Sequence, residues 1–503
     1  MKRSNNIHHK CNNLLLCAAS YHAARIQYTL NMKCNTLSCL KLFTASLLMV
    51  LFSFSSCKKA EDITVETPKP EKVLSDLGAL GARVKIVHLY RDTVYLLQGA
   101  FVRKDGEQLI IDEGTLIKVG NAAASGLYSG QGGITIDKGG LLIANGTREN
   151  PIVFTSAASY ATQDKNWDGI KIEGKSVNNT AISGSEDITD RSCSIKFMRI
   201  EFSSLTLDAV GSNSIVENIQ VSYTKSRSSF RIFGGTFNAR NLVSYACGGP
   251  ADFYFSKGYS GKMQNLLAYR HPFFGNTTGV SPYDNPEESP FPIERRTAGL
   301  LIENNPDDDT LLPYTFPILS NVTVIGPHLQ NGTAAEYISS TLRSGALFTT
   351  NNVRFNIRNS VFSGFPRAGW YLEGQQTALD LFGKISDIGY SGFHCNDTTR
   401  TLALSADLAP LTPTLKNYII SSGSVRQVLK GADSWYQDPF NYESINLFPI
   451  DGSPILTGAN FGGSVFSDPF FNKVTYIGAL GNDNWLQGWT NFTPLRTNYN
   501  NPE

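Results

Sequence analysis

The stretch GIKIEGKS at residues 169–176 matches the pattern G-x-x-x-x-G-K-[ST], which is typical of loops that bind nucleotide phosphates. A working phosphate loop needs a flexible turn between its glycines and a helix after them, so that backbone N–H groups converge on the phosphate. Here the residues between the glycines alternate between apolar and charged, and Val-Asn-Asn-Thr follows. We therefore expect a strand at this position and no nucleotide as a partner.

The other residue types suited to chemistry are scattered along the chain. The sequence contains no H-E-x-x-H and no G-x-S-x-G, so neither a zinc protease nor a serine hydrolase is indicated. The run Asp307-Asp308-Asp309 lacks the spaced ligands and the glycine of a calcium loop, and we interpret it as a solvated turn. His394-Cys395 places an imidazole beside a thiol but identifies no third partner. We expect no metal, no cofactor and no catalytic residue.

Cysteine usage also argues against a disulfide framework or a zinc site. Cys193, Cys247 and Cys395 are far apart and form no C-x-x-C motif, so we expect each to be a buried single cysteine. Basic residues (44) and acidic residues (43) nearly balance, for a net charge of +1, which gives no electrostatic surface for nucleic acid.

A short phrase recurs along the middle of the chain, and it indicates the elements that must position any site. Ile200-Glu201-Phe202, Val221-Ser222-Tyr223, Val243-Ser244-Tyr245 and Leu267-Ala268-Tyr269 follow one another at spacings of 21, 22 and 24 residues. Each triplet reads inward, outward, inward, as in a half-buried strand. A fixed period above twenty residues predicts a solenoid, because one such unit cannot bury its apolar face alone.

A second series runs in step with the first and predicts a second strand in each coil. Leu207-Asp208-Ala209, Phe230-Arg231-Ile232 and Phe253-Tyr254-Phe255 are each 23 residues apart, with glycine pairs at the corners. Two strands and their turns in such a period fit a β-helix coil, whereas a leucine-rich repeat would need a pattern that is absent. We therefore predict an all-β parallel β-helix solenoid.

The second series also predicts an outward column made of Asp208, Arg231 and Tyr254. Neighbouring rungs are about 4.8 Å apart, so Asp208 and Arg231 would pair and Arg231 would lie against the ring of Tyr254. One interpretation is a small site for an anionic or sugar ligand, with the arginine as a fork and the tyrosine as a platform. The other is an exposed ion pair worth about 0–1 kcal/mol, beside an aromatic that covers the coil.

The N-terminal region carries export signals. A basic stretch opens at Met32, residues 42–54 are uncharged and mostly apolar, and Cys57 follows two serines. This order is typical of a secretory signal peptide, and the small residues before the cysteine resemble a lipobox, which implies lipidation at Cys57. We assign residues 1–31 to a mis-called start, 32–56 to a lipoprotein signal peptide and 57–85 to the lipidated N-terminus and tether.

The remaining chain is assigned to two regions. Residues 86–415 are predicted to form the parallel β-helix, with a long excursion near 280–295 and a short helix near 373–386. Residues 416–503 are predicted to be an irregular cap over the end of the solenoid, because the sequence from about 440 is rich in Asn, Gly and aromatic residues.

Longer phrases carry a family resemblance. LIANGTRENPIVFTS (142–156), WDGIKIEGKSVNN (167–179), FGGTFNARNLVSYA (233–246) and YIGALGNDNWLQGWTNF (476–492) resemble the exported right-handed parallel β-helix proteins of Bacteroidota. The resemblance implies a right-handed, pectin-lyase-like β-helix and a lipid-anchored address on the cell surface at the outer membrane. Acidic runs of that family are mostly missing here, where SRSSFRIFGG (226–235) and GPADFYFSKG (249–258) stand.

These observations lead to a ranked set of functions. We expect a non-catalytic binding or adhesion protein whose partner is a polysaccharide or another surface protein. A divergent polysaccharide lyase or glycoside hydrolase on the same fold is the alternative, with Arg231 or Lys257 as the nominated basic residue. A purely structural role in the envelope is the third.

Overall fold

The computed structural model describes residues 69–74, 83–122, 128–129, 132–158, 166–180, 186–225, 227–271, 296–326, 343–365, 368–395, 397–421, 425–427 and 431–499. The chain divides into two compact units, Met1–Thr67 and Pro68–Glu503, and every described residue belongs to the second. Cys57 and the segments 1–31 and 32–56 therefore lie outside the described residues. Within these ranges, no helix is both long and apolar enough to cross a membrane.

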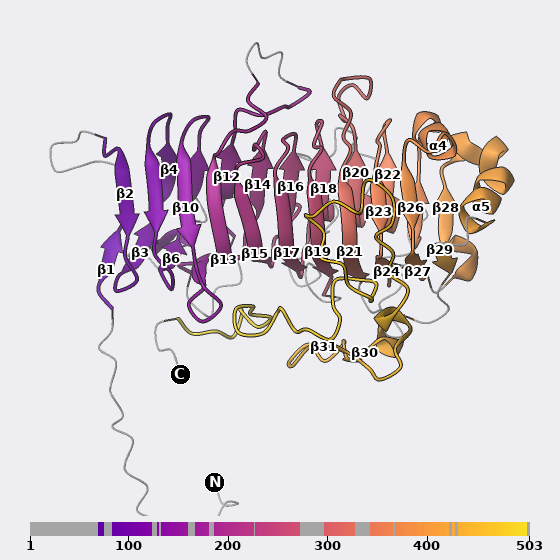
Figure 1. Cartoon of the computed structure of the whole chain (residues 1–503). Coiled ribbons are helices and arrows are strands. Elements are labelled where there is room, and N and C mark those ends of the chain that lie inside the picture. The colour runs from indigo at the N-terminus through magenta and orange to yellow at the C-terminus, as the bar shows by residue number, and fades with distance from the viewer. Residues whose placement is uncertain are drawn as a thin grey trace, which may run out of the picture. The chain divides into compact units, whose positions relative to one another are not determined.

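Short parallel strands stack along the second unit in two sheets (Figure 1). The major sheet has seventeen strands in the described part of the chain: β1 (Glu71–Val73), β2 (Ile86–Leu89), β3 (Val94–Leu97), β5 (Gln108–Ile111), β6 (Leu116–Val119), β10 (Leu141–Asn145), β11 (Ile152–Ser156), β13 (Cys193–Glu201), β15 (Ile215–Ser222), β17 (Asn238–Tyr245), β19 (Lys262–Tyr269), β21 (Ile318–Ile325), β23 (Asn356–Arg358), β24 (Val361–Ser363), β26 (Asp387–Gly389), β27 (Ser391–Phe393) and β29 (Val425–Gln427).

The minor sheet forms the other long side of each coil. Its ten strands, again counted among the described residues, are β4 (Gly99–Arg103), β9 (Gly132–Ile136), β12 (Gly169–Glu173), β14 (Leu205–Asp208), β16 (Phe230–Phe233), β18 (Ala251–Ser256), β20 (Arg296–Glu303), β22 (Arg343–Thr350), β25 (Trp370–Leu372) and β28 (Leu402–Leu404). Two small antiparallel pairs are β7 (Asn121–Ala122) with β8 (Tyr128–Ser129), and β30 (Tyr436–Asp438) with β31 (Asn446–Pro449). The GIKIEGKS stretch contains β12, which confirms its interpretation as a strand.

Asparagines make the bend in the longer strands of the major sheet. Asn218, Asn241 and Asn265 have φ values of 56°, 57° and 63°, a left-handed conformation that asparagine adopts more readily than most residues. The side chains connect successive coils, since Asn241 Nδ2 donates to Asn218 Oδ1 at 3.0 Å and Asn265 Nδ2 donates to Asn241 Oδ1 at 2.9 Å. The chain thus turns from one face of the solenoid to the next at the same point in each coil.

Apolar side chains fill the interior of the coils in stacked columns. Phe230 and Phe253 are both fully buried, and their rings stack with centroids 4.8 Å apart and planes within 10°. The stacking of such a pair contributes about 0.5–1.5 kcal/mol to stability, beyond the contribution from burying the two rings. The predicted alignment of Phe230 with Phe253 is confirmed by the pairing of β16 with β18.

One ion pair is buried in the same part of the solenoid. Arg270 Nε lies 2.8 Å from Asp252 Oδ2, and the two side chains are only 6% and 0% exposed. Ser244 Oγ also donates to Asp252 Oδ1 at 2.6 Å, and Arg270 donates to the carbonyl of Ala298 at 3.1 Å. Each charged group is therefore compensated inside the protein.

The first predicted series is correct for its first and last pairs of triplets and wrong for the middle pair. Ile200 pairs with Val221, as expected, but Val221 pairs with Ser244 and not with Val243. A shift of one residue moves side chains to the opposite face of a strand. Tyr245 consequently lies on the outer face, where its ring meets Phe492 at 5.0 Å.

Helices, not the C-terminal residues, lie at the end of the solenoid (Figure 1). The chain forms α4 (Gln375–Phe382), which confirms the predicted short helix, and α5 (Thr412–Ser421), whose Leu415 and Ile419 are buried in the core. Short 3₁₀ helices in the described residues are η2 (Thr398–Arg400), η3 (Ala406–Leu411), η4 (Ala432–Ser434) and η5 (Pro454–Leu456).

The segment 454–499, here named the C-terminal strap, runs back along the outer face of the major sheet (yellow in Figure 1). Gln220 donates to the carbonyl of Asn491 at 2.8 Å and accepts from its backbone N–H at 2.7 Å. Gln264 makes the same two bonds to Asn472, each 2.8 Å long. The strap therefore does not cap the open end, because its polar backbone groups bond to side chains along the coils. Residues 416–421 of the predicted cap, 416–503, do lie at that end as part of α5.

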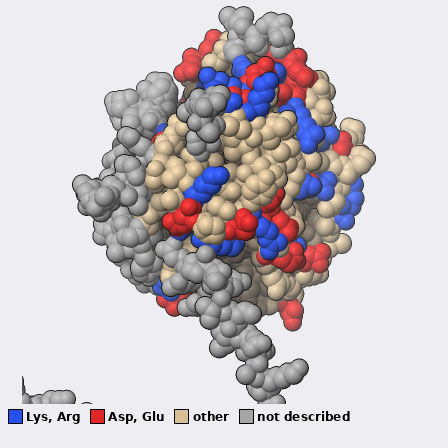
Figure 2. All heavy atoms as spheres, turned by 90° about the vertical axis from the view of Figure 1, so that its left-hand side faces the viewer, with Lys and Arg blue, Asp and Glu red and all other residues tan. Residues whose placement is uncertain are grey.

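The paired strands also extend beyond the predicted bounds of 86–415. Glu71–Val73, assigned from the sequence to the tether, forms β1 and pairs with β3, while β29 lies past residue 415 and pairs with β27. Figure 2 shows the N-terminal end, where uncharged residues fill much of the middle and charges of both signs surround them. The predicted excursion near 280–295 lies outside the described residues.

Candidate functional site

The minor sheet carries the three residues predicted to form an outward column, but in a different register. Thr206 pairs with Arg231 and Arg231 pairs with Tyr254, whereas Asp208 pairs with Phe233. The predicted pairing of Asp208 with Arg231 is therefore wrong by two residues. Leu205 and Leu207 both face the core, so an alternating pattern fits two registers equally well.

Tyr254 belongs to an apolar cluster on the outer face of the minor sheet, and Arg231 lies beside Phe233 of that cluster. Tyr254 is 4% exposed and its hydroxyl donates to a carboxylate oxygen of Glu303, so its ring is not an open platform for a ligand. The guanidinium of Arg231 lies 5.1 Å from the ring centroid of Phe233, which also meets Tyr254 edge-on. Arg231 and Tyr254 thus pack around Phe233, which is the register partner of Asp208.

Asp208 instead lines a pocket at the carboxyl ends of the minor-sheet strands. The pocket has a volume of about 310 Å³ and is named here the polar pocket; its lining residues are Lys138, Glu173, Ser176, Asn178, Thr180, Asp208, Ala209 and Lys257. They come from the ends of β12 and β14 and from the turns that follow β9, β12, β14 and β18. The coils of β9, β12, β14 and β18 thus contribute one or more residues each, whereas the coil of β16 contributes none.

Close stacking of these turns depends on a glycine after β12. A Cβ atom at Gly174 would lie 2.2 Å from the carbonyl oxygen of Ala209. Any residue other than glycine would therefore clash with the backbone of the next coil. The turn after β18 has its own constraint, since Lys257 has a φ of 56°. Both features hold the turns at one end of the sheet, where the polar pocket forms.

Two carboxylates stand on adjacent rungs of the polar pocket. Glu173 and Asp208 are partners in the parallel register, so their side chains leave the sheet on the same side. Burial raises the pKa of the Asp208 carboxyl, and a hydrogen bond from Asn178 Nδ2, 2.6 Å from Oδ1, opposes that rise. Glu173 forms an ion pair with Lys171. The pocket therefore holds one carboxyl biased toward its protonated form beside one in an ion pair.

The pocket also contains two positively charged side chains, Lys138 and Lys257. Lys257 lowers the pKa of Asp208 by its charge, and its ammonium lies 5.3 Å from the ring centroid of Phe233. Lys138 lies in the turn after β9 on the other side of Glu173. Ammonium, amide and carboxyl groups around one cavity can bind a molecule that offers both hydroxyl donors and acceptors.

Glu173, Lys138 and Asn178 were missed from the sequence, although a signal for Glu173 was present, whereas Lys257 was nominated there as a basic residue. Aligning IDKG (136–139), IEGK (172–175) and LDAV (207–210) places an acidic residue after the last inward apolar residue of three consecutive coils. That alignment requires the correct register of β14.

Two histidines and the acidic run at 307–309 have local surroundings that account for them. His88 Nε2 lies 2.7 Å from Asp112 Oδ1, and burial lowers the pKa of His271 to about 4. Asp308 accepts from the backbone and hydroxyl of Thr310, which confirms a turn in that acidic run.

The prediction of three buried single cysteines is confirmed. Cys193, Cys247 and Cys395 are free and buried, and burial raises the pKa of each thiol. Among the residues that the structure describes, no group of three or more His, Cys, Asp or Glu side chains is arranged to hold a metal ion.

The fold and the pocket at the strand ends define a protein of the parallel β-helix class. Residues 81–389 match the family model described as a pectate-lyase-like beta helix domain, and the chain belongs to that family. The predicted right-handed parallel β-helix solenoid and pectin-lyase-like fold are thereby confirmed. No curated protein and no solved structure matches the chain.

Proposed function

We propose that this protein binds glycans in the polar pocket. The observation that carries the proposal is the convergence of Glu173, Asp208, Asn178 and two lysines on a cavity of about 310 Å³. Sugar hydroxyls both donate and accept hydrogen bonds, so carboxylate acceptors beside ammonium and amide donors suit them. The volume lies at the lower end of the range for small-molecule sites, which favours a short segment of a glycan or its terminal residue.

The proposal includes a lipid anchor at Cys57 and an address on the cell surface at the outer membrane. Support comes from the uncharged segment 42–54 and the small residues before Cys57. Two acyl chains are enough for stable anchoring. The substitution Cys57→Ala is expected to move the protein from the membrane fraction to the soluble fraction. An unchanged distribution would contradict the anchor.

The experiment for glycan binding uses the full chain carrying Cys57→Ala, tested against a panel of neutral and acidic polysaccharides. Glu173→Gln and Lys138→Ala are expected to weaken binding of the selected glycan about tenfold each, because each removes one charged hydrogen-bonding group. Lys72→Ala, at an exposed lysine of β1, is the matched control. Equal binding by all four proteins would refute the assignment of the polar pocket.

Glycoside hydrolysis is a second candidate function, favoured by the pair of carboxyl groups on adjacent rungs. Glycosidases commonly use one carboxylic acid of raised pKa and one carboxylate. Asp208 has the raised pKa and Glu173 is its neighbour in register. In this case Asp208→Asn would abolish release of oligosaccharide while the variant still bound the glycan.

Assaying the products of each polysaccharide in the same binding experiment distinguishes the remaining functions. Unsaturated product ends would indicate a lyase, and saturated products would indicate a hydrolase. Binding without products supports the non-catalytic proposal. Absence of both binding and products would contradict glycan recognition and favour protein adhesion or a structural role in the envelope.

A further inference from the structure

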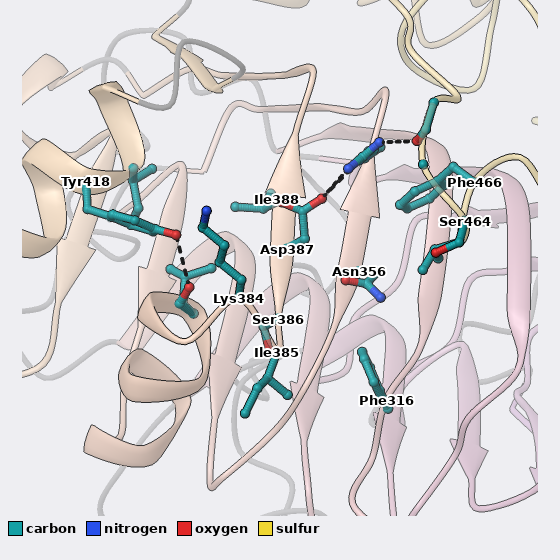
Figure 3. A pocket seen from close by; sticks show the side chains of 16 residues that line it. Phe316, Asn356, Lys384, Ile385, Ser386, Asp387, Ile388, Tyr418, Ser464 and Phe466 are labelled. Carbon is teal, nitrogen blue, oxygen red and sulfur yellow. Dashed lines mark hydrogen bonds and ion pairs between the residues drawn. The ribbon is translucent and has the colours of Figure 1, made fainter.

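A second and larger cavity lies at the C-terminal end of the solenoid, away from the polar pocket. It has a volume of about 610 Å³ and is named here the end groove; β23, β26, the ends of α4 and α5 and residues 462–466 of the strap surround it (Figure 3). Its volume is within the range of cavities that hold small molecules. No residue of the end groove lines the polar pocket.

Apolar side chains make up much of the groove wall. Ile385 is 43% exposed, and the half-buried Phe316, Tyr418 and Val465 offer further apolar surface. Behind them Leu381, Ile388, Ile419 and Phe466 are buried. A ligand with an apolar body would gain roughly 25 cal/mol for each Å² of apolar surface that it removes from water here.

Two of the charges in the groove neutralise each other. Arg358 donates to Asp387 Oδ2 from Nε at 3.0 Å and from Nη2 at 2.8 Å, and its Nη1 donates to the carbonyl of Gly462 at 2.7 Å. Its guanidinium also lies 4.8 Å from the ring centroid of Phe466. Arg358 thus fixes the strap wall of the groove and satisfies Asp387.

Lys384 is the remaining charge. Its ammonium has no hydrogen-bond or ion-pair partner among the described residues, and Figure 3 shows it between Tyr418 and Asp387 with no interaction drawn. Lys384 follows Gly383 at the end of α4 and has a φ of 57°, a conformation that costs a non-glycine residue about 1–2 kcal/mol. A lysine at a helix end also complements the helix dipole, so the test must separate that role from ligand binding.

We propose that the end groove binds an amphipathic anion, a carboxylate or sulfonate on an apolar body. The anionic group would pair with Lys384, and the apolar body would lie against Ile385, Phe316 and Tyr418. Charge complementarity decides the class: with Arg358 and Asp387 paired, Lys384 leaves the groove with one net positive charge. This proposal does not depend on glycan binding.

The test is calorimetric titration of the folded full chain carrying Cys57→Ala, with naphthalene-2-carboxylate as probe and neutral naphthalene-2-methanol as its analogue. We expect one site that prefers the carboxylate, with affinity falling as salt is raised. Lys384→Met keeps the apolar stem and should weaken carboxylate binding about tenfold while leaving the neutral analogue nearly unchanged. Lys85→Met, at an exposed lysine of the first coils, is the control.

A blocking variant makes the test independent of the charge. Ser464→Trp places a large ring on the exposed strap wall and should abolish binding of both probes with little change in melting temperature. Absence of probe binding, equal affinity for the two probes, or binding that persists in Ser464→Trp would each overturn the proposal. A lower melting temperature for Lys384→Met with unchanged affinity would assign the lysine to the helix end and also overturn it.

Discussion

The buried pair of Asp252 and Arg270 allows a quantitative test of how the solenoid tolerates charge. In Arg270→Met the new side chain is of similar length and fills the space, but Asp252 keeps only the hydrogen bond from Ser244 among its two described partners. Removing one member of a buried ion pair typically costs 3–5 kcal/mol, because the other charge stays in a medium of low polarity. We expect a loss of that size, about 3–5 kcal/mol, at pH 7.

The pH dependence follows from the carboxyl that remains. Burial already raises the pKa of Asp252, and the charge of Arg270 is the largest effect that opposes the rise. In the variant the folded-state pKa is therefore higher still, while an unfolded aspartate titrates near about 3.9. Between these two values the folded state binds more protons, so its stability falls as pH rises, by up to about 1.4 kcal/mol per unit. The cost should shrink as pH is lowered toward 4.

The assay is urea unfolding of the wild type, Arg270→Met and the double variant Asp252→Asn/Arg270→Met, followed by circular dichroism at several pH values. The double variant should recover part of the lost stability at pH 7 and show little of the pH dependence, since it has no buried carboxyl. A cost independent of pH, or a double variant no more stable than the single one, would refute the reasoning.

Three further changes have expected outcomes. Phe253→Ala should lower the free energy of unfolding by about 3–5 kcal/mol through the cavity beside Phe230, whereas Phe253→Leu should cost less, as measured by urea unfolding. Asn321→Ala removes two 3.1 Å hydrogen bonds to the strap and a residue suited to φ 57°, so stability should fall by about 2–4 kcal/mol and proteolysis of the strap should quicken. Hydrogen bonds from Arg83 lower the pKa of Glu107 to about 2. The stability that these bonds provide is therefore present above about pH 4.5 and is lost as the pH falls toward 2. The melting temperature of Glu107→Gln should accordingly fall less on acidification than that of the wild type.

The fold was predictable because its repeats are visible as a period. Phe230 and Phe253 align at 23 residues in both sequence and structure. The register of neighbouring strands was harder to predict where both faces are covered. Tyr245 looks like a core residue by its type, yet the strap and not the coil interior buries it, and local alternation cannot distinguish the two.

The candidate site could be predicted only in part. Asp208 was singled out as an outward residue near the end of its strand, and it does line a pocket. Its true neighbour Glu173 was hidden, since Leu205 and Leu207 allow the strand to be read two residues out of step. The end groove was not predictable at all, because Phe466 and Lys384 line one cavity only through the return of the strap across more than eighty residues of sequence.

The C-terminal strap also sets an order of assembly. Each coil pairs with its neighbour across about 23 residues here, so coils can form one after another as the chain is made. Gln220 and Asn491 are 271 positions apart, and a contact so distant in sequence forms late because it closes a long loop. Until residues 454–499 arrive, the outer face with Tyr245 and Gln220 is exposed to water. That face is therefore open to other contacts until the strap covers it.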